Sequence, residues 1–394
     1  MRVLLVAYGS RGDVEPMCAL GLRLKETGAD VMVAAPLDAE FAALLKRAGL
    51  LHLPLGEPVR RRVSAAAPVP RDTASLIAAS FNTIASVAAD CDAMVATGMF
   101  PVVAAARSAA DALGPRYRHV SFQSTALPSR HHPPLPRPGR ALPAGTTDRH
   151  VLWGYDAVVM QQLFGTAVNG HRALIGLPPL RNVRDHVFGP SPLLASDAVL
   201  DPWRPTDLDA VQTGRWVLPD ARPLPPELDA FLAAGPPPVY VGFGSIPMRG
   251  ADEVARVAVT AARAAGHRVV LARGWADLRP IDDADDCVSV GEVNQQALFS
   301  RIAAVVHHGG AGTTAAAARA GTPQVVLPQI ADQPHWAARV ADLGIGCALT
   351  ATRVTPRTLT AAIESALDMR TRAEAVAATM TDDGARIAAD LLRA

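Results

Sequence analysis

The chain has little cysteine, and the cysteines it has are not spaced for a structural or catalytic role. Its 394 residues include only Cys18, Cys91, Cys287 and Cys347, which lie far apart and form no C-x-x-C pair. A disulfide framework would need a closely spaced set of cysteines, and a zinc site would need paired ligands. These scattered thiols predict neither kind of site.

Long apolar runs and excess charge are absent as well. No uncharged apolar stretch reaches the roughly 18 residues needed to span a bilayer. The apolar start from Met1 to Val6 is soon broken by Gly9 and Arg11, which favours a buried strand over a signal peptide. With a formal net charge of +1, the chain gives no electrostatic reason to expect nucleic acid or an anionic membrane as a partner. We expect a soluble cytoplasmic protein without stable membrane insertion.

Instead, short apolar runs alternate with helical patterns in both halves of the chain. In the first half, Val3 to Tyr8 predicts a strand, Glu15 to Thr27 a helix and Val31 to Ala35 a second strand. In the second half, Ala303 to Val306 predicts a strand and Thr313 to Ala320 a helix. Continuous apolar strands between helices are typical of parallel sheets covered on both faces. Because 394 residues are too many for one ordinary core, the fold class is α/β with two Rossmann-like domains.

Two segments rich in turn-forming residues interrupt this alternation. We place the hinge between the domains in residues 201–226, where prolines and glycine are frequent. Residues 127–147 contain six prolines, and loops of this length are usually binding loops or disordered. For this second segment two alternatives stay open, a loop over the cleft or a disordered stretch.

A glycine-rich turn between a strand and a helix is the most informative motif of the chain. The run Val305-Val306-His307-His308-Gly309-Gly310-Ala311-Gly312-Thr313-Thr314 brings free backbone N–H groups to the positive end of a helix dipole. Glycines let a phosphate approach the backbone closely, and His308 and Thr313 add side-chain donors. Asp332 and Gln333, further along the chain, can bind vicinal hydroxyls. A phosphate-binding turn together with residues that can bind sugar hydroxyls indicates a nucleotide-sugar site.

Other positions of the second half extend this site. Gly242-Phe243-Gly244-Ser245 ends an earlier strand, and its glycines and the Ser245 hydroxyl suit a diphosphate oxygen. Trp275 and Val293 follow the middle strands, at positions that usually border a nucleoside. The alternative for His308 is a satisfied core histidine. The alternative for Asp332 is a helix cap before a proline, which does not exclude sugar binding.

The first half has its own motif, Gly9-Ser10-Arg11-Gly12-Asp13-Val14-Glu15-Pro16, at the carboxyl end of the first strand. Ligands of open α/β sheets bind at such ends, so Asp13 is placed to act as a general base. Ser10 can orient that carboxylate or the acceptor hydroxyl, and Arg11 can reach an anion across the cleft. Spacing alone leaves open that Asp13 serves only the helix start. The motif is not G-x-G-x-x-G, so a nicotinamide-cofactor fingerprint is absent.

These motifs together resemble those of a known family. Over its whole length the chain resembles the two-domain GT-B glycosyltransferases of family 1 type from actinobacterial antibiotic biosynthesis. Within that group it is most similar to the vancomycin-group glycopeptide glycosyltransferases. The resemblance is carried by Gly9 to Pro16, Ala210 to Trp216, Val241 to Ser245, Gly291 to Asn294, His307 to Thr313 and Ala331 to Pro334.

The resemblance implies a GT-B fold, with two facing Rossmann-like domains and a cleft between them. Residues 1–215 would form the acceptor-binding domain, 216–226 the linker and 227–375 the nucleotide-sugar-binding domain. Residues 376–394 would form a helix that packs back toward the first domain. The resemblance further implies a metal-independent, inverting hexosyltransferase with no cofactor other than its UDP- or dTDP-linked sugar co-substrate.

The family's site roles fall on matching positions of this chain. Asp13 would be the catalytic base, with Ser10 as its neighbour. The donor diphosphate would be bound by Arg11, Ser245, His308, Gly309, Gly310, Ala311, Gly312 and Thr313. Trp275 and Val293 would bind the nucleoside, and Asp332 and Gln333 the donor sugar.

The resemblance implies a small-molecule donor and a peptide-antibiotic acceptor of the vancomycin or teicoplanin type, and we expect a monomer. In one departure, plant members place a Trp where this chain has Gly291, so recognition of the base must use other contacts. Whether the donor carries uracil or thymine stays open. The alternatives are a glycosyltransferase for a macrolide or polyketide, and a nucleotide-sugar epimerase on the same fold. A nicotinamide-dependent oxidoreductase is opposed by the missing fingerprint, and a non-catalytic sugar-nucleotide sensor by Asp13.

Overall fold

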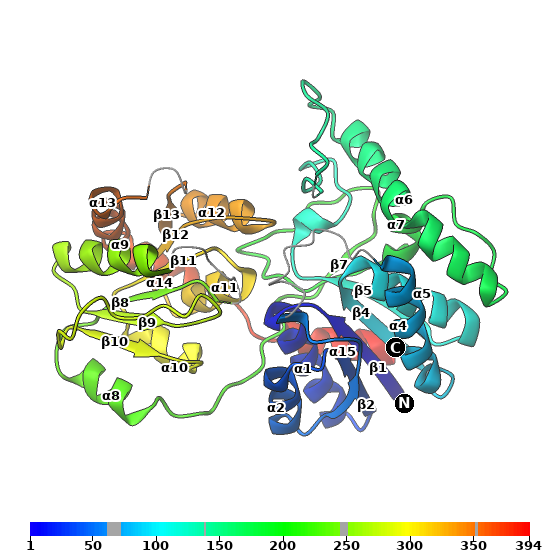
Figure 1. Cartoon of the computed structure of the whole chain (residues 1–394), viewed down its shortest axis with the longest axis horizontal. Helices are drawn as coiled ribbons and strands as arrows, with labels where there is room; N and C mark the ends of the chain where they lie inside the picture. The colour runs from blue at the N-terminus through cyan, green and yellow to red at the C-terminus, as the bar shows by residue number, and fades with distance from the viewer. Residues whose placement is uncertain (61–71, 138, 245–250, 351–353) are drawn as a thin grey trace. The chain divides into compact units, whose positions relative to one another are not determined.

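The protein consists of two α/β units, each with its own sheet (Figure 1). The structure is a computed structural model that describes residues 1–60, 72–137, 139–244, 251–350 and 354–394. One unit comprises Met1–Leu218 and Thr381–Ala394, and the other Pro219–Met380. The division after Leu218 falls inside the turn-rich residues 201–226. Trp216, which the predicted linker includes, is buried in the core of the first unit.

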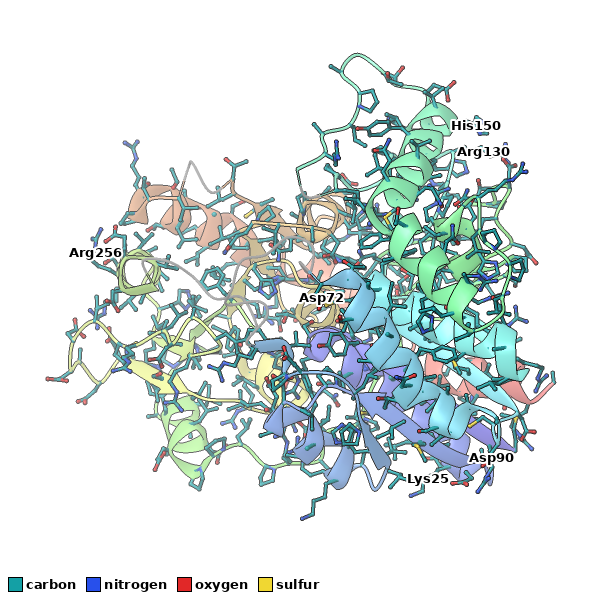
Figure 2. All side chains as sticks on the ribbon, turned by 45° about the vertical axis from the view of Figure 1, so that its right-hand side comes forward. Lys25, Asp72, Asp90, Arg130, His150 and Arg256 are labelled. Carbon is teal, nitrogen blue, oxygen red and sulfur yellow. The ribbon has the colours of Figure 1, made fainter. Side chains whose placement is uncertain are left out.

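The first unit is built on a parallel sheet with strand order β3-β2-β1-β4-β5-β6-β7. Its strands are β1 (Arg2–Tyr8), β2 (Asp30–Ala35), β3 (Leu51–Pro54), β4 (Ala93–Gly98), β5 (Arg116–Ser121), β6 (Leu193–Leu194) and β7 (Val211–Gln212). Its helices include α1 (Arg11–Glu26), α2 (Ala39–Arg47), α4 (Thr73–Ala88), α5 (Phe100–Leu113), α6 (Arg149–Leu174), α7 (Val183–Phe188) and α15 (Gly384–Arg393), with a 3-10 turn at Ser124–Ala126. Figure 2 adds the side chains, and its labels Lys25 and Asp72 mark α1 and the residue before α4.

Apolar side chains cover this sheet on both faces, as the continuous apolar strands predict. Successive residues of a strand point to opposite faces. On β1, Val3 and Leu5 join one buried cluster, whereas Leu4 and Val6 join another. All four side chains are almost completely buried. The prediction of a parallel sheet between two layers of helices is therefore confirmed for this unit.

The second unit repeats the arrangement with strand order β10-β9-β8-β11-β12-β13, again all parallel. Its strands are β8 (Val239–Gly242), β9 (Val269–Ala272), β10 (Cys287–Val290), β11 (Ala304–His307), β12 (Gln324–Val326) and β13 (Gly346–Ala348). Its helices include α8 (Pro226–Ala233), α9 (Ala251–Ala264), α10 (Gln295–Leu298), α11 (Ala311–Arg319), α12 (Gln333–Asp342), α13 (Pro356–Leu367) and α14 (Arg370–Ala377), with a 3-10 turn at Phe299–Arg301.

The strand order places one switch point in each unit. The chain leaves β1 toward β2 on one side and returns to β4 on the other, and β8 is flanked in the same way by β9 and β11. At such a point the loops after the two strands diverge and leave a crevice outside their carboxyl ends. We therefore expect ligands after β1 and β4 in the first unit, and after β8 and β11 in the second.

The segment 127–147 packs against α6 in its described residues. His132 accepts a hydrogen bond from the Trp153 indole N–H at 3.0 Å, and Arg137 pairs with the buried Asp156 at 2.8 Å. None of the helices in the described ranges combines the length and the apolar composition that a bilayer span requires.

Helix α15 returns to the first unit and packs beside α1 (Figure 1). Ala385, Ala388 and Leu392 lie in the same buried cluster as Val14 of α1. The Leu392 carbonyl accepts a hydrogen bond from the Arg116 guanidinium at 2.8 Å. The last helix thereby completes the core on one face of the first sheet.

Gly384 allows the first turn of α15 to approach the backbone of residues 214 and 215. A Cβ on Gly384 would lie 2.4 Å from the Gly214 oxygen and 2.6 Å from the Arg215 oxygen. Because backbone cannot yield as a flexible side chain can, we expect Gly384→Ala to lower the free energy of unfolding by about 1–3 kcal/mol. Denaturant unfolding measures this change.

Gly154 provides a matched control, because it is also helical and a Cβ there would meet nothing within 4 Å. Gly154→Ala should leave the free energy of unfolding unchanged or raise it by up to about 1 kcal/mol. Equal stability of the two variants would contradict the tight approach at Gly384.

Candidate functional site

The turn after β1 is fixed by a reciprocal cap at the start of α1. Ser10 is the N-cap, and its hydroxyl accepts a hydrogen bond from the Gly12 N–H at 3.2 Å. Asp13 Oδ2 accepts the Ser10 N–H at 2.8 Å and lies 3.4 Å from the Ser10 hydroxyl. A capping box of this kind satisfies two N–H groups of the helix start. It explains why α1 begins at Arg11, earlier than the predicted Glu15.

Gly9 makes room for the Asp13 carboxylate. A Cβ on Gly9 would lie 2.1 Å from Asp13 Oδ2, so the carboxylate packs directly against the backbone after β1. Asp13 is only partly buried, as are Ser10 and Arg11. The Arg11 guanidinium forms an ion pair with Glu15 one turn further along the helix. The structure thus brings the three predicted residues of the first unit together at its switch point.

In the second unit, His307 fixes the backbone after β11. Its Nδ1 accepts the Gly309 N–H at 3.1 Å, and its Nε2 lies 2.9 Å from the Gln324 side-chain oxygen. His307 is completely buried, and burial lowers its pKa to about 3, with the neighbouring His308 acting in the same direction. A neutral His307 therefore holds the turn, as a packing residue rather than as a ligand.

His308 lies in the middle of the turns that end β8 and β11. A Cβ on Gly244 would lie 3.0 Å from its Cε1, and one on Gly310 would lie 2.5 Å from its Nε2. Burial lowers the pKa of His308 to about 4, and the nearby Gly242 backbone acts in the opposite direction. Its buried Nδ1 has no hydrogen-bond partner in the described part of the chain. His308 is thus a neutral imidazole at the start of α11.

Helix α11 begins without a side-chain cap. Its N-cap is Gly310, and within the described ranges no hydrogen bond reaches the N–H groups of Ala311, Gly312 or Thr313. A Cβ on Gly312 would meet nothing within 4 Å, so this turn is open on its outer side. Uncapped amides at the positive end of a helix dipole are suited to bind an anion. Ser245, the remaining predicted diphosphate contact of this unit, lies outside the described residues.

Asp332 and Gln333 are held in place by neighbours on α12 and in the preceding loop. The indole N–H of Trp336 donates to Asp332 Oδ2 at 2.7 Å. The Gln333 side-chain oxygen accepts the N–H groups of Gln329 at 2.8 Å and Ile330 at 3.0 Å. Ala331, which lies between Ile330 and Asp332, has a φ of 54°. A non-glycine residue adopts this value only when its surroundings enforce it. Asp332 is the N-cap residue of α12, and its side chain makes no cap hydrogen bond to that helix.

The two predicted nucleoside positions have different surroundings. Trp275 is partly exposed, and its backbone N–H donates to the Gly244 carbonyl at 3.0 Å. Val293 packs against the buried cluster that includes Val290 and Leu298. The side chain of Val293 is therefore mainly a core contact, which leaves its backbone for a ligand.

Contacts connect most of the predicted residues of the second unit. The His308 ring lies against Gly244 and Gly310. A Cβ on Gly309 would lie 3.2 Å from the backbone oxygen of Gln333. Trp275 joins the same group through Gly244. Trp336 is a further residue of this group that the motifs did not indicate, although its spacing of one helical turn from Asp332 is a signal for it.

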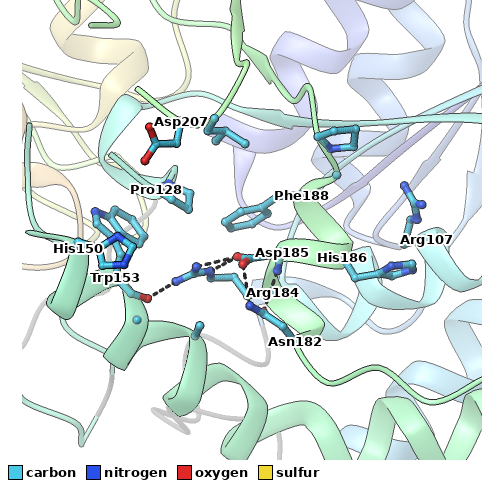
Figure 3. A pocket seen from close by; sticks show the side chains of 15 residues that line it. Arg107, Pro128, His150, Trp153, Asn182, Arg184, Asp185, His186, Phe188 and Asp207 are labelled. Carbon is cyan, nitrogen blue, oxygen red and sulfur yellow. Dashed lines mark hydrogen bonds and ion pairs between the residues drawn. The ribbon is translucent and has the colours of Figure 1, made fainter. Parts of the chain in front are cut away.

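A separate cavity of about 620 Å³ lies in the first unit, lined by none of the predicted site residues (Figure 3). Its walls include Trp153 and Phe188. The Arg184 guanidinium donates to the Trp153 carbonyl at 2.7 Å and pairs with Asp185 at 2.6 Å and with the buried Asp156 at 3.1 Å. The charged groups beside this cavity thus largely satisfy one another.

Comparisons with known proteins identify the family. A model of the glycosyltransferase family 28 N-terminal domain matches residues 3–124, and a model of the erythromycin biosynthesis protein CIII-like C-terminal domain matches residues 256–388. Glycosyltransferase GtfE and vancomycin aglycone glucosyltransferase, both from Amycolatopsis orientalis, are each 48% identical to this chain and cover 100% of it and 97% of their own length. The chain belongs to the vancomycin-group glycosyltransferases. The predicted resemblance is confirmed, and with it glycosyltransferase activity.

Solved structures confirm the GT-B fold of this glycosyltransferase. The glycotransferase of kitacinnamycin superimposes with a TM-score of 0.71 at 20% identity, covering 100% of this chain and 98% of its own. The spinosyn forosaminyltransferase SpnP superimposes with a TM-score of 0.70 at 19% identity, covering 96% and 94%. At these identities the similarity concerns the fold alone.

The buried His308 gives the stability of the protein a pH dependence. In the folded state its pKa is about 4, against 6.5 for an unperturbed histidine, so between these values the unfolded state binds more protons. Stability should therefore be complete above about pH 6.5 and fall as the pH is lowered. For this residue the loss from about pH 7.5 to about pH 5 is about 2 kcal/mol.

We expect His308→Asn to be less stable overall but to lose about 2 kcal/mol less than the wild type over the same interval. Denaturant unfolding at both pH values measures the difference. Between about pH 8 and pH 7 the two proteins should differ by a constant amount. An equal loss for both at about pH 5 would contradict a buried, neutral His308.

Proposed function

We propose that this glycosyltransferase moves a hexose from a UDP- or dTDP-sugar to a hydroxyl of a glycopeptide antibiotic aglycone of the vancomycin or teicoplanin type. The observation that carries the proposal is the 48% identity to vancomycin aglycone glucosyltransferase, which extends over 100% of this chain. The dTDP-epi-vancosaminyltransferase of Amycolatopsis orientalis is 44% identical over 95% of this chain. Because that relative's name specifies a dTDP-linked amino sugar, the donor has to be tested rather than assumed.

In the proposed reaction, Asp13 is the general base. Its carboxylate takes the proton of the acceptor hydroxyl while the oxygen attacks the anomeric carbon of the donor. The bond from that carbon to the diphosphate breaks at the same time, so the configuration inverts. The Ser10 N–H and hydroxyl, at 2.8 and 3.4 Å from Asp13 Oδ2, support this role because they fix the carboxylate before the acceptor arrives.

The leaving diphosphate would be bound without a metal ion by the start of α11. The uncapped N–H groups of Ala311, Gly312 and Thr313, the helix dipole and the His308 imidazole can stabilise the developing charge. Ser245 would add a hydroxyl donor. Arg11 would add a cation, for which its guanidinium has to leave Glu15. Release of that pair costs little, because partly exposed ion pairs contribute about 0–1 kcal/mol.

The donor sugar would lie at the start of α12. The Gln333 oxygen is engaged by two backbone N–H groups, so its NH2 group is the part that donates to a sugar hydroxyl. The Asp332 carboxylate, held by Trp336, accepts from a hydroxyl. Trp275 and the backbone of Val293 would border the nucleoside. No further cofactor is required in this scheme.

A transfer assay tests the proposed function. UDP-glucose, dTDP-glucose and a dTDP-amino sugar are each incubated with vancomycin- and teicoplanin-type aglycones, with and without a metal chelator, and products are detected by mass. We expect hexose addition to at least one aglycone, unaffected by the chelator, with inversion seen in the NMR coupling of the anomeric proton. Conversion of a donor without any aglycone would instead favour an epimerase, and transfer only to a macrolide would favour a different acceptor class.

Substitution of Asp13 tests the base. Asp13→Asn keeps an oxygen acceptor for the Ser10 N–H, so the cap on α1 persists while the base is lost. We expect kcat to fall by about 10²–10⁴-fold with the Kd for UDP or dTDP unchanged. Asp72→Asn is the matched control, because Asp72 caps α4 through the Ser75 N–H at 3.0 Å and is labelled in Figure 2. Turnover near the wild-type rate in Asp13→Asn would remove Asp13 from the mechanism.

A further inference from the structure

The side chain of Arg273 lies at the carboxyl edge of the second sheet. It follows β9 directly, and its N–H donates to the Val290 carbonyl of β10 at 2.9 Å, so its backbone is fixed. The side chain is exposed and makes no hydrogen bond or ion pair with the described residues. Other arginines of this unit are paired, for example Arg222 with Glu292 and Arg279 with Asp277. An unpaired guanidinium on a fixed backbone is available to a ligand.

The guanidinium of Arg273 occupies the side-chain space of Gly291. A Cβ built on Gly291 would have Arg273 Nη2 as its nearest neighbour, at 3.0 Å. Gly291 has no positive φ that would require glycine for backbone reasons. The absence of a side chain at this position therefore has one visible effect, which is to let the guanidinium lie over the loop after β10.

The loop after β10, residues 291–294, is held in place by side-chain hydrogen bonds. The Glu292 carboxylate accepts a hydrogen bond from Arg222 at 3.0 Å. The Asn294 side chain donates to the carbonyls of Asp220 at 2.7 Å and Arg222 at 2.8 Å, and also caps α10. With both ends of the loop tied, the distance between Gly291 and the guanidinium is set by the Arg273 side chain alone.

The same segment is joined to the start of the anion-binding turn. Gly274 has a φ of 54°, and a Cβ there would lie 2.5 Å from the Gly244 oxygen. Gly244 in turn lies against the ring of His308. Arg273 is therefore a direct neighbour of the backbone that contacts the proposed diphosphate site, on its β9 side.

We propose that the pyrimidine base of the donor nucleotide stacks on the Arg273 guanidinium. In this proposal, Gly291 has no side chain so that the guanidinium can lie over the loop after β10. The inference rests on the proposed function, since it assigns a binding surface to the nucleoside end of the same donor. A guanidinium is planar and weakly hydrated, so it stacks on ring faces in a way that an ammonium group does not. Its N–H groups can also reach the carbonyl oxygens of uracil or thymine.

A competing role for the same cation is charge attraction to the diphosphate, and two substitutions separate the roles. Arg273→Ala removes both the positive charge and the planar guanidinium group, whereas Arg273→Lys keeps the charge and removes only the planar group. Binding of UDP, dTDP and inorganic pyrophosphate is measured by calorimetry. We expect both variants to bind UDP and dTDP about ten-fold more weakly, in line with the loss of one stacked base, and to bind pyrophosphate as the wild type does.

Gly291→Ala tests the second half of the proposal. Its Cβ meets only the flexible end of Arg273, so the fold should tolerate it while the guanidinium is displaced. We expect weaker binding of both nucleotides, and no further loss when Gly291→Ala is combined with Arg273→Ala, because residues that act as a unit are not additive. Arg279→Ala, which removes an exposed arginine of the same unit, should bind as the wild type does.

The outcomes separate this inference from the function on which it rests. Wild-type affinity in Arg273→Lys, or an equal loss of pyrophosphate binding in Arg273→Ala, would place the cation on the diphosphate and overturn the stacking role. Unchanged nucleotide binding in Arg273→Ala would overturn it as well. If the wild type bound neither UDP nor dTDP, the proposed function itself would fail.

Discussion

The organisation of the second unit depends on how closely the backbone approaches the imidazole of His308. Gly244 and Gly310 each lie where a Cβ would press on this ring, and Gly309 lies where a Cβ would meet the Gln333 backbone. Because none of these residues has a side chain, the end of β8 and the starts of α11 and α12 converge within a few ångströms. A buried neutral ring at the centre gives this junction a fixed shape without adding a charge.

The fold could be derived from the sequence because each strand is a continuous apolar run between helices. The element bounds were less accurate where a local hydrogen bond decides them. Helix α1 begins at Arg11, before the predicted Glu15, because Ser10 and Asp13 cap each other. The apolar periodicity on which the prediction rests does not include such polar side-chain bonds.

In the candidate site too, some residues could be predicted from local sequence motifs and others could not. Glycine-rich turns after strands pointed to His308 and to the start of α11, since turn chemistry is local. The contact between Arg273 and Gly291 joins two strands and depends on the path of one long side chain, so spacing does not reveal it. For Asp13, spacing left capping and catalysis as alternatives. The structure shows the cap, and a carboxylate already fixed by two Ser10 donors is compatible with both roles.

The return of α15 to the first unit has a consequence for biosynthesis. Residues 1–218 are translated before the whole second unit, yet one face of their sheet is covered by a helix at residues 384–393. Until that helix has been made, the apolar surface around Val14 and Leu20 lacks the α15 contacts of the folded protein, whereas the second unit is built from one contiguous segment. The nascent chain is therefore expected to complete the core of its earlier unit only after its later unit has been synthesised.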